Sequence, residues 1–217
     1  MILAIESGSN ICSIAIFDNA KLISSINISG KNIHDSLLAQ TTKELLRYSN
    51  VDFNEIKYVS VNIGPGSFTG LRIGLSFAKG LIYGKEIKLL GLISNDILFY
   101  SINKVLLPNS IKKIATLISS GNDNFYYKSF DVDNDFIIDE LQIISLDKLM
   151  DKLEKDTLII GNLGGIFPKV SNIILNKDLL AADQLNISKK YIKDENFADL
   201  KSIKPLYLNE INYKINN

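Results

Sequence analysis

The sequence predicts a mixed α/β fold built from two lobes of similar organisation. Each half of the 217-residue chain opens with three strand-like runs, and each then continues into alternating helical and strand-like patterns. The pattern is interrupted at Pro108-Asn109-Ser110, between the two halves. We therefore expect a first lobe at residues 1–104 and a smaller second lobe at residues 105–217, whose tail after Pro205 can pack back on the first.

Hydrophobic periodicity predicts the elements of the first half in order. Three strands come first, with Ser7-Gly8-Ser9-Asn10 as a turn, at residues 2–6, 11–17 and 21–28. Helices and strands then alternate, at residues 33–48, 56–63, 69–83, 88–92 and 95–101. The first half therefore has the order β-β-β-α-β-α-β-α.

The second half begins with the same order. Three strands, a helix and a further strand are expected at residues 113–119, 125–132, 136–144, 147–154 and 157–161. The polar stretches 131–135 and 189–195 are expected to be solvated loops or exposed faces. The recurring order suggests a duplicated unit, although the two halves share no obvious residue-level similarity.

Composition narrows the functional classes. The 24 Lys and Arg residues balance the 24 Asp and Glu residues, so the total charge gives no reason for unaided nucleic-acid binding, although a local basic patch can hide in a balanced total. The longest uncharged run, 58–71, is short and rich in glycine, which excludes a membrane-spanning helix there. A single cysteine, Cys12, and the lack of a leader-like start predict a cytoplasmic protein.

The most distinctive segment is Gly64-Pro65-Gly66-Ser67-Phe68-Thr69-Gly70, between a predicted strand and a predicted helix. A turn of this kind can present free N–H groups to a phosphate. It matches neither the P-loop, which needs Lys before Ser or Thr, nor the dinucleotide fingerprint. Two interpretations stay open. It is either a tight turn before a closely packed helix, or part of a nucleotide contact whose candidate residues are Glu6, Ser7, Gly64, Gly66 and Ser67.

The helix that follows this turn carries a stripe of small residues, since Gly70, Gly74 and Ala78 recur every four positions. Such a stripe lets another element approach closely. It can serve the chain's own core or a seam for a partner, and the sequence does not separate the two. If it is a partner seam, Gly74→Leu should block the partner without unfolding the chain.

The sequence gives little support for a nucleophilic catalytic site or for a metal site. His34 is the only histidine, and its neighbours Asp35 and Ser36 point in other directions on a helix, so they do not form a triad. Cys12 on a predicted strand is expected to be a buried structural thiol. One histidine and one cysteine cannot supply a nitrogen and sulfur ligand set for zinc.

These residues resemble the TsaB (YeaZ) family of bacterial tRNA-modification subunits, which is related to the glycoprotease-like TsaD family. The resemblance rests on residues 2–7, on His34 with Leu37-Leu38, and above all on the segment 64–74 continuing through Ala78-Lys79-Gly80-Leu81. Pro205-Leu206-Tyr207-Leu208 is a weaker match. The similarity is clear over about the first hundred residues.

The resemblance implies an actin-like ATPase fold of two ribonuclease-H-like lobes. It implies a non-catalytic subunit that pairs with and activates TsaD in forming N6-threonylcarbamoyladenosine at position 37 of tRNAs, with TsaE as a further partner, a homodimer when alone, and tRNA bound only through the complex. ATP or ADP would lie at the complex junction. The implied pairing surface consists of Ile33, His34, Leu37, Leu38, Thr41, Leu45, Gly70, Gly74 and Ala78.

The sequence departs from the family patterns at three places. TsaD-like chains carry two metal-binding histidines on the helix after the fifth strand, where this chain has Ser94-Asn95-Asp96-Ile97-Leu98. The usual Asp-Thr-Ser is Glu6-Ser7-Gly8, and the usual Asp-Ala-Arg is Ser119-Ser120-Gly121. A stand-alone ATPase or phosphotransferase is the alternative function, and a peptidase dependent on His34 is a third.

Overall fold

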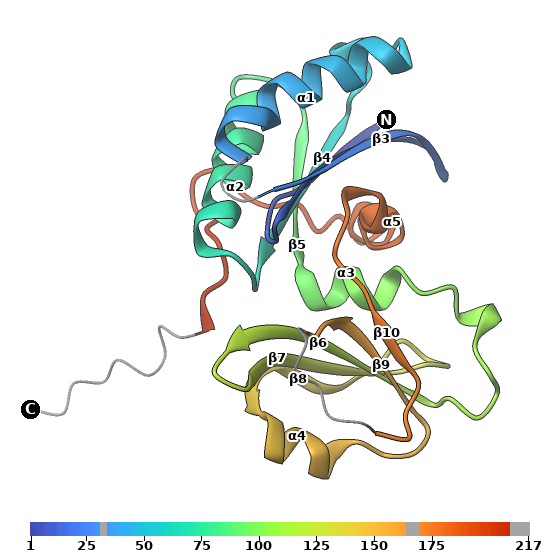
Figure 1. The fold of residues 1–217 in the computed structure, drawn as a ribbon. Coiled ribbons are helices and arrows are strands. Elements are labelled where there is room, and N and C mark those ends of the chain that lie inside the picture. Colours follow the sequence, from blue (N-terminus) through green and yellow to red (C-terminus); the bar gives the residue numbers. More distant parts are fainter. Residues whose placement is uncertain (31–33, 164–169, 209–217) are drawn as a thin grey trace, which may run out of the picture.

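The computed structural model describes residues 1–30, 34–163 and 170–208, without the side chains of His34 and Asp35. Two five-stranded sheets form the two lobes, one above the other in Figure 1, with helices between them. Among the described residues, no helix is both long and apolar enough to cross a bilayer.

The first sheet has the order β3-β2-β1-β4-β5. Its strands are β1 (Ile2–Glu6), β2 (Ile11–Asp18), β3 (Lys21–Ser29), β4 (Tyr58–Gly64) and β5 (Lys88–Ile93). The three-strand meander is antiparallel, whereas β1, β4 and β5 run parallel because helices connect them. The connecting helices are α1 (His34–Ser49), which is followed by the short helix η1 (Phe53–Glu55), and α2 (Phe68–Ile82).

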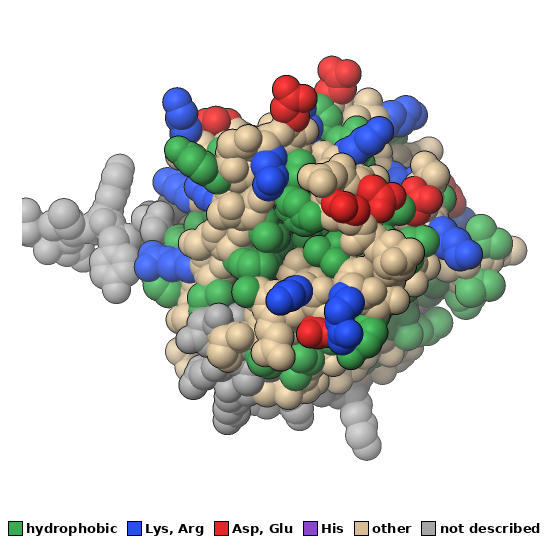
Figure 2. Space-filling view, turned by 90° about the horizontal axis from the view of Figure 1, so that it is seen from above, with side chains coloured by type: hydrophobic (Ala, Val, Ile, Leu, Met, Phe, Trp, Pro, Cys, Tyr) green, Lys and Arg blue, Asp and Glu red, His purple; other side chains and the backbone are tan. Residues whose placement is uncertain are grey.

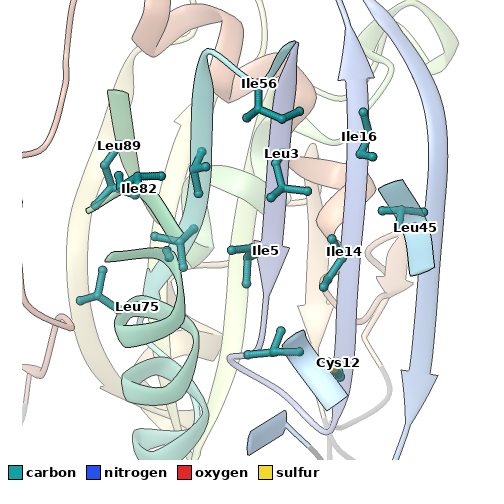
Figure 3. Close-up of a cluster of buried hydrophobic side chains, with 14 of the residues drawn as sticks. Leu3, Ile5, Cys12, Ile14, Ile16, Leu45, Ile56, Leu75, Ile82 and Leu89 are labelled. Atoms are coloured by element: carbon teal, nitrogen blue, oxygen red, sulfur yellow. The ribbon is translucent and has the colours of Figure 1, made fainter. Parts of the chain in front are cut away.

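Both faces of the first sheet are covered. All five residues of β1 are buried, which reflects a strand with cover on both sides. Leu3 and Ile5 pack in the cluster beneath α1 and α2, which Figure 3 shows, while Ile2 and Ala4 pack against the opposite layer. Cys12 lies in the cluster beneath α1 and α2, and burial raises the pKa of its thiol to about 11, as expected for a structural thiol.

The second sheet has the order β10-β9-β6-β7-β8, which repeats the first when each strand is numbered within its own lobe. Its strands are β6 (Lys113–Gly121), β7 (Asn124–Asp131), β8 (Ile137–Ser145), β9 (Thr157–Asn162) and β10 (Ile174–Asn176). The helix α4 (Leu146–Lys152) follows β8. The duplicated unit predicted from the order of elements is therefore present.

The layer between the sheets consists of α3 (Ser94–Tyr100) together with η4 (Ala181–Gln184) and α5 (Leu185–Lys193). The link between the lobes contains the short helix η2 (Lys104–Leu106). One hydrophobic cluster joins residues of both sheets through α3, where Phe99 stacks on Phe130 of β7 at 4.0 Å between ring centroids. The two lobes thus share a core.

The chain returns to the first lobe earlier than the sequence suggested. Ala181 of η4 packs against β1 and β2, and the described segment after α5, through residue 208, packs along the first lobe. There, the Leu206 amide donates to the Ile63 carbonyl at 2.7 Å, and Arg72 of α2 donates to the Tyr207 hydroxyl at 2.9 Å. Residues well before Pro205 therefore already belong to the first lobe in space.

The predicted elements lie close to the observed ones, with ends that differ by a few residues. Among the described residues, the strand β10, the helix α5 and the short helices η1, η2 and η4 were not predicted. The stretch 189–195, expected as a solvated loop or exposed face, lies mostly at the end of α5, whose outer side is exposed while Ile187 and Ser188 are buried. The lysines of this stretch form the polar side of an amphipathic helix.

Candidate functional site

A polar cluster lies at the carboxyl end of the first sheet, where β1, β4 and α3 meet. Its members Glu6, Asn62 and Ser94 are fully buried. Oε1 of Glu6 accepts hydrogen bonds from the Gly8 amide at 2.8 Å and from Asn62 Nδ2 at 2.9 Å. Ser94 Oγ lies 2.8 Å from Asn62 Oδ1. The cluster is therefore held together by its own polar atoms.

Glu6 has an unusual environment within this cluster. Burial raises the pKa of its carboxyl group to about 7, although the hydrogen bonds from Asn62 and Gly8 act in the opposite direction. Its Oε2 atom is buried and has no hydrogen-bond partner among the described residues. Glu6 therefore changes its charge near neutral pH.

The glycine-rich turn is pressed against the turn after β1. The Ser67 amide donates to the Gly8 carbonyl at 2.8 Å, and Ser7 Oγ donates to the Gly70 carbonyl at 2.9 Å. Ser67 Oγ caps α2 by accepting from the Gly70 amide at 3.3 Å. A Cβ atom at Gly66 would lie only 2.6 Å from the Gly8 carbonyl oxygen. Glycine is thus needed for the close approach of the two turns.

The candidate nucleotide contacts Glu6, Ser7, Gly64, Gly66 and Ser67 come together at these turns, where several of their polar atoms are bound within the chain. The Glu6 carboxylate would repel an anion, and the Ser7 hydroxyl is already bound to Gly70. Gly66 lies against Gly8, and Gly64 is buried with φ at +117°. The alternative interpretation, a tight turn that starts a closely packed helix, accounts for this geometry.

The small-residue stripe of α2 faces the interior of its own lobe. A Cβ atom at Gly70 would lie 2.0 Å from the Ser7 carbonyl oxygen, and one at Gly74 would lie 2.1 Å from Ser7 Oγ. Ala78 is fully buried in the cluster beneath α1 and α2. The prediction that these three residues form a pairing surface is therefore wrong, because β1 and its turn already occupy that face. Gly74→Leu should unfold the lobe.

The residues predicted on α1 have a similar position. Leu38, Thr41 and Leu45 are buried, and Leu37 is half-buried against the same core. The chain itself therefore covers these residues, and it is the outer sides of the two helices that are exposed. Ile33 lies outside the described residues, as does the side chain of His34.

An apolar groove of about 400 Å³ lies open between the outer sides of α1 and α2. We call it the helix-pair groove, and its lining residues are Ala39, Thr42, Lys43, Leu46, Val51, Asp52, Phe53, Phe77 and Leu81. Figure 2 views the end of the molecule at which α1 lies, and hydrophobic side chains gather near the centre of that face. Gly80, next to the lining residue Leu81, is exposed, and a Cβ atom there would meet nothing within 4 Å.

The first residues of α3 lie where TsaD-like chains carry two histidines and this chain has none. They bind the second lobe: Asn95 Nδ2 donates to the Thr116 carbonyl at 3.0 Å, and Asp96 forms a buried ion pair with Lys128 at 2.7 Å. In the described ranges, no three His, Cys, Asp or Glu side chains come together in a group that could hold a metal ion. The start of α3 therefore joins the lobes.

Gln184 is a member of the buried polar layer that the sequence analysis missed. Its Nε2 donates to the Ile5 carbonyl at 2.8 Å, and its Oε1 accepts from Ser60 Oγ at 2.7 Å. No local sequence pattern indicates this role, because its partners Ile5 and Ser60 lie more than a hundred positions away in the sequence. Asn62 carried a weak signal, since it is a polar residue inside an apolar strand.

Comparisons with known proteins agree on the family. The family described as TsaD, tRNA N6-adenosine threonylcarbamoyltransferase, matches residues 22–160. The tRNA threonylcarbamoyladenosine biosynthesis protein TsaB of Buchnera aphidicola subsp. Baizongia pistaciae is 27% identical, over 96% of this chain and 98% of that protein. The tRNA N6-adenosine threonylcarbamoyltransferase of Clostridium novyi is 26% identical over 98% of this chain, which spans 67% of that protein.

Among solved structures, YeaZ from Pseudomonas aeruginosa superposes with a TM-score of 0.80 at 18% identity, covering 95% of this chain and 99% of that one. The two lobes of repeated strand order define a protein with the actin-like ATPase fold of two ribonuclease-H-like lobes. The chain belongs to the TsaD family of glycoprotease-like proteins, and within it to the TsaB (YeaZ) group.

Proposed function

We propose that this chain is a cytoplasmic, non-catalytic subunit in the biosynthesis of threonylcarbamoyladenosine on tRNA. It pairs with TsaD, the catalytic subunit, and activates it, while TsaD forms N6-threonylcarbamoyladenosine at position 37 of tRNAs. Membership of the TsaB group supports the pathway. The internal use of the polar groups at the end of β1 supports the non-catalytic role, because these groups bind one another.

The helix-pair groove is the observation that carries the pairing proposal. Its walls are mostly apolar residues of α1, α2 and the segment 51–53, and Thr42, Lys43 and Asp52 are its polar lining residues. An apolar centre with polar residues around it is the usual composition of a protein interface. The stripe Gly70, Gly74 and Ala78 contributes indirectly, because it seats α2 on β1 and so fixes the position of the groove wall.

In this proposal the same surface forms a homodimer when TsaD is absent, and TsaE joins the assembled complex. ATP or ADP would lie at the junction of the subunits and not at the strand-end turn, since the polar atoms of that turn are already bound. A nucleotide site completed by two subunits would bind no nucleotide on this chain alone. Calorimetry with ATP and magnesium on the isolated chain checks this point.

The pairing is tested by a large residue at the edge of the helix-pair groove. Gly80→Trp adds bulk beside the groove where a side chain meets no atom of its own lobe, so the fold should survive. We expect its affinity for cognate TsaD, measured by calorimetry, to fall at least about tenfold, which is about 1.4 kcal/mol.

Lys148→Trp, on the exposed side of α4 in the second lobe, is the matched control and should bind TsaD as the native chain does. Both variants should keep the melting temperature of the native chain. Absence of binding by the native chain, or equal binding by Gly80→Trp, would contradict the pairing proposal.

A further inference from the structure

A second cavity lies on the first lobe and shares no lining residue with the helix-pair groove. It has a volume of about 620 Å³ and is bordered by the first residues of β1, the β2–β3 turn, the start of β4 and the last turns of α5. Three lysines from two separate parts of the chain line it, namely Lys57, Lys189 and Lys193. A balanced total charge therefore hides a local basic surface.

The lysines are available for an external ligand. All three are exposed, and among the described residues none of them forms an ion pair. Their neighbour Lys190, in contrast, is paired with Asp194 at 3.0 Å and does not line the cavity. Lys189 and Lys193 are four positions apart on α5, so they project from the same side of the helix.

The rest of the lining indicates what kind of anion fits. Tyr58 and Ile192 supply apolar wall, and Asp18, at the end of β2, is the single acidic residue. A carboxylate would repel a lone phosphate, but it can accept a hydrogen bond from a ribose 2′-hydroxyl. Exposed lysines around an open cavity suit a polymer with spaced phosphates better than a small anion, which needs buried converging donors.

We infer that this basic cavity binds the phosphodiester backbone of RNA, and that it contributes phosphate contacts when tRNA is bound to the complex. The inference rests on the proposed function for the identity of the RNA, but not on the helix-pair groove. It assigns to this chain a direct contact with tRNA, beyond the pairing with TsaD. Lysine contacts with phosphates position the nucleic acid and read no sequence.

The test compares two triple variants of equal charge. Lys57→Gln, Lys189→Gln and Lys193→Gln together remove the cavity's charge, while Lys148→Gln, Lys155→Gln and Lys201→Gln remove three exposed lysines elsewhere. Complex formation with cognate TsaD is checked first by size-exclusion chromatography. Unmodified tRNA is then titrated at several salt concentrations, with fluorescence anisotropy as the readout. If no complex forms, which is a failure of the proposed function, the same titration is made at low salt with this chain alone.

We expect the cavity variant to bind tRNA about tenfold more weakly and to reduce the slope of log affinity against log salt by about 2 to 3, since each phosphate contact contributes slightly less than one. The control variant should behave as the native chain does. Equal affinities and slopes for the two variants would overturn the inference. So would AMP binding that needs the three lysines while tRNA binding does not, because the cavity would then be a mononucleotide site.

Discussion

The two lobes share one strand order but differ in what lies at the end of their first strand. In the first lobe, β1 ends in a buried carboxyl group that Gly8 and Asn62 hold. In the second lobe, the corresponding strand β6 ends at the exposed residues Ser119 and Gly121. The two lobes therefore share a topology but differ in the side chains at the end of their first strands.

The lobes also differ in their cover. The first sheet is enclosed by α1 and α2 on one face and by η4 and α5 on the other, so that β1 is buried throughout. In the second lobe the corresponding strand β6 is buried only at residues 114–117 and becomes exposed toward its end. The two candidate surfaces for partners both lie on the first lobe, whose central strand is the more deeply buried of the two.

The connection between the lobes should give the largest effect on stability. Lys128→Met removes the cation beside Asp96, and burial already raises the pKa of that carboxyl group. We expect a loss of about 3 to 5 kcal/mol of unfolding free energy, because a buried charge is left without its partner. Denaturant titration measures this loss. Lys190→Met, which breaks an exposed pair with Asp194, should cost less than about 1 kcal/mol, and similar losses for both would mean that α3 does not join the lobes.

A smaller effect, of about 3 kcal/mol, is expected from Gly70→Ala in the first lobe. Its Cβ atom would lie 2.0 Å from the backbone carbonyl oxygen of Ser7, so the turn after β1 has to move. Gly80→Ala on the same helix meets no atom and should be neutral or stabilising by up to about 1 kcal/mol. Thermal unfolding of the two variants checks the prediction. Equal melting temperatures would show that α2 is not seated on β1.

The buried carboxyl of the first lobe predicts a pH dependence. The pKa of Glu6 is raised from 4.5 to about 7, so the folded state retains a proton that the unfolded state has lost. The carboxyl group therefore lowers stability progressively as pH rises from about 4.5 to 7. Glu6→Gln, which cannot ionise, should exceed the native chain by on the order of 2 to 3 kcal/mol at pH 8 and by little at pH 4.5.

Chemical denaturation at both pH values measures this difference. Glu86→Gln, at an exposed position, is the control variant and is measured at the same two pH values. A constant difference between Glu6→Gln and the native chain at the two pH values would contradict the assignment of a neutral-range titration to Glu6.

Hydrophobic periodicity was sufficient to predict the repeated order of elements, because the period of apolar residues in strands and long helices is a local property. It did not lead to α5, because Lys189, Lys190 and Lys193 were interpreted as a solvated stretch and not as the polar side of a helix. It cannot indicate Gln184, whose partners lie far away in sequence. The small-residue stripe on α2 was recognised from the sequence, but the sequence did not show that it faces the interior of its own lobe. A stripe of small residues indicates that another element packs closely on the helix, but it does not show whether that element belongs to the same chain or to a partner.

The same limit applies to the two candidate surfaces. The helix-pair groove joins Leu46 of α1 with Phe77 of α2 and Phe53 of η1, and the basic cavity joins Lys57 with Lys193. Each set is assembled from distant segments by the fold. Family motifs indicated the helices and the glycine-rich turn. The residues that line the groove and the cavity, in contrast, form no motif that a single sequence reveals.

The central claim, that this chain is a partner which TsaD requires, is tested most directly by product formation. A reconstituted mixture of the cognate pathway proteins, namely TsaD, TsaE and a further one, TsaC, is combined with tRNA, with and without this chain. Threonylcarbamoyladenosine is measured after digestion of the tRNA. The account predicts product only when the chain is present, and reduced product with Gly80→Trp. Equal product in the absence of the chain would contradict it.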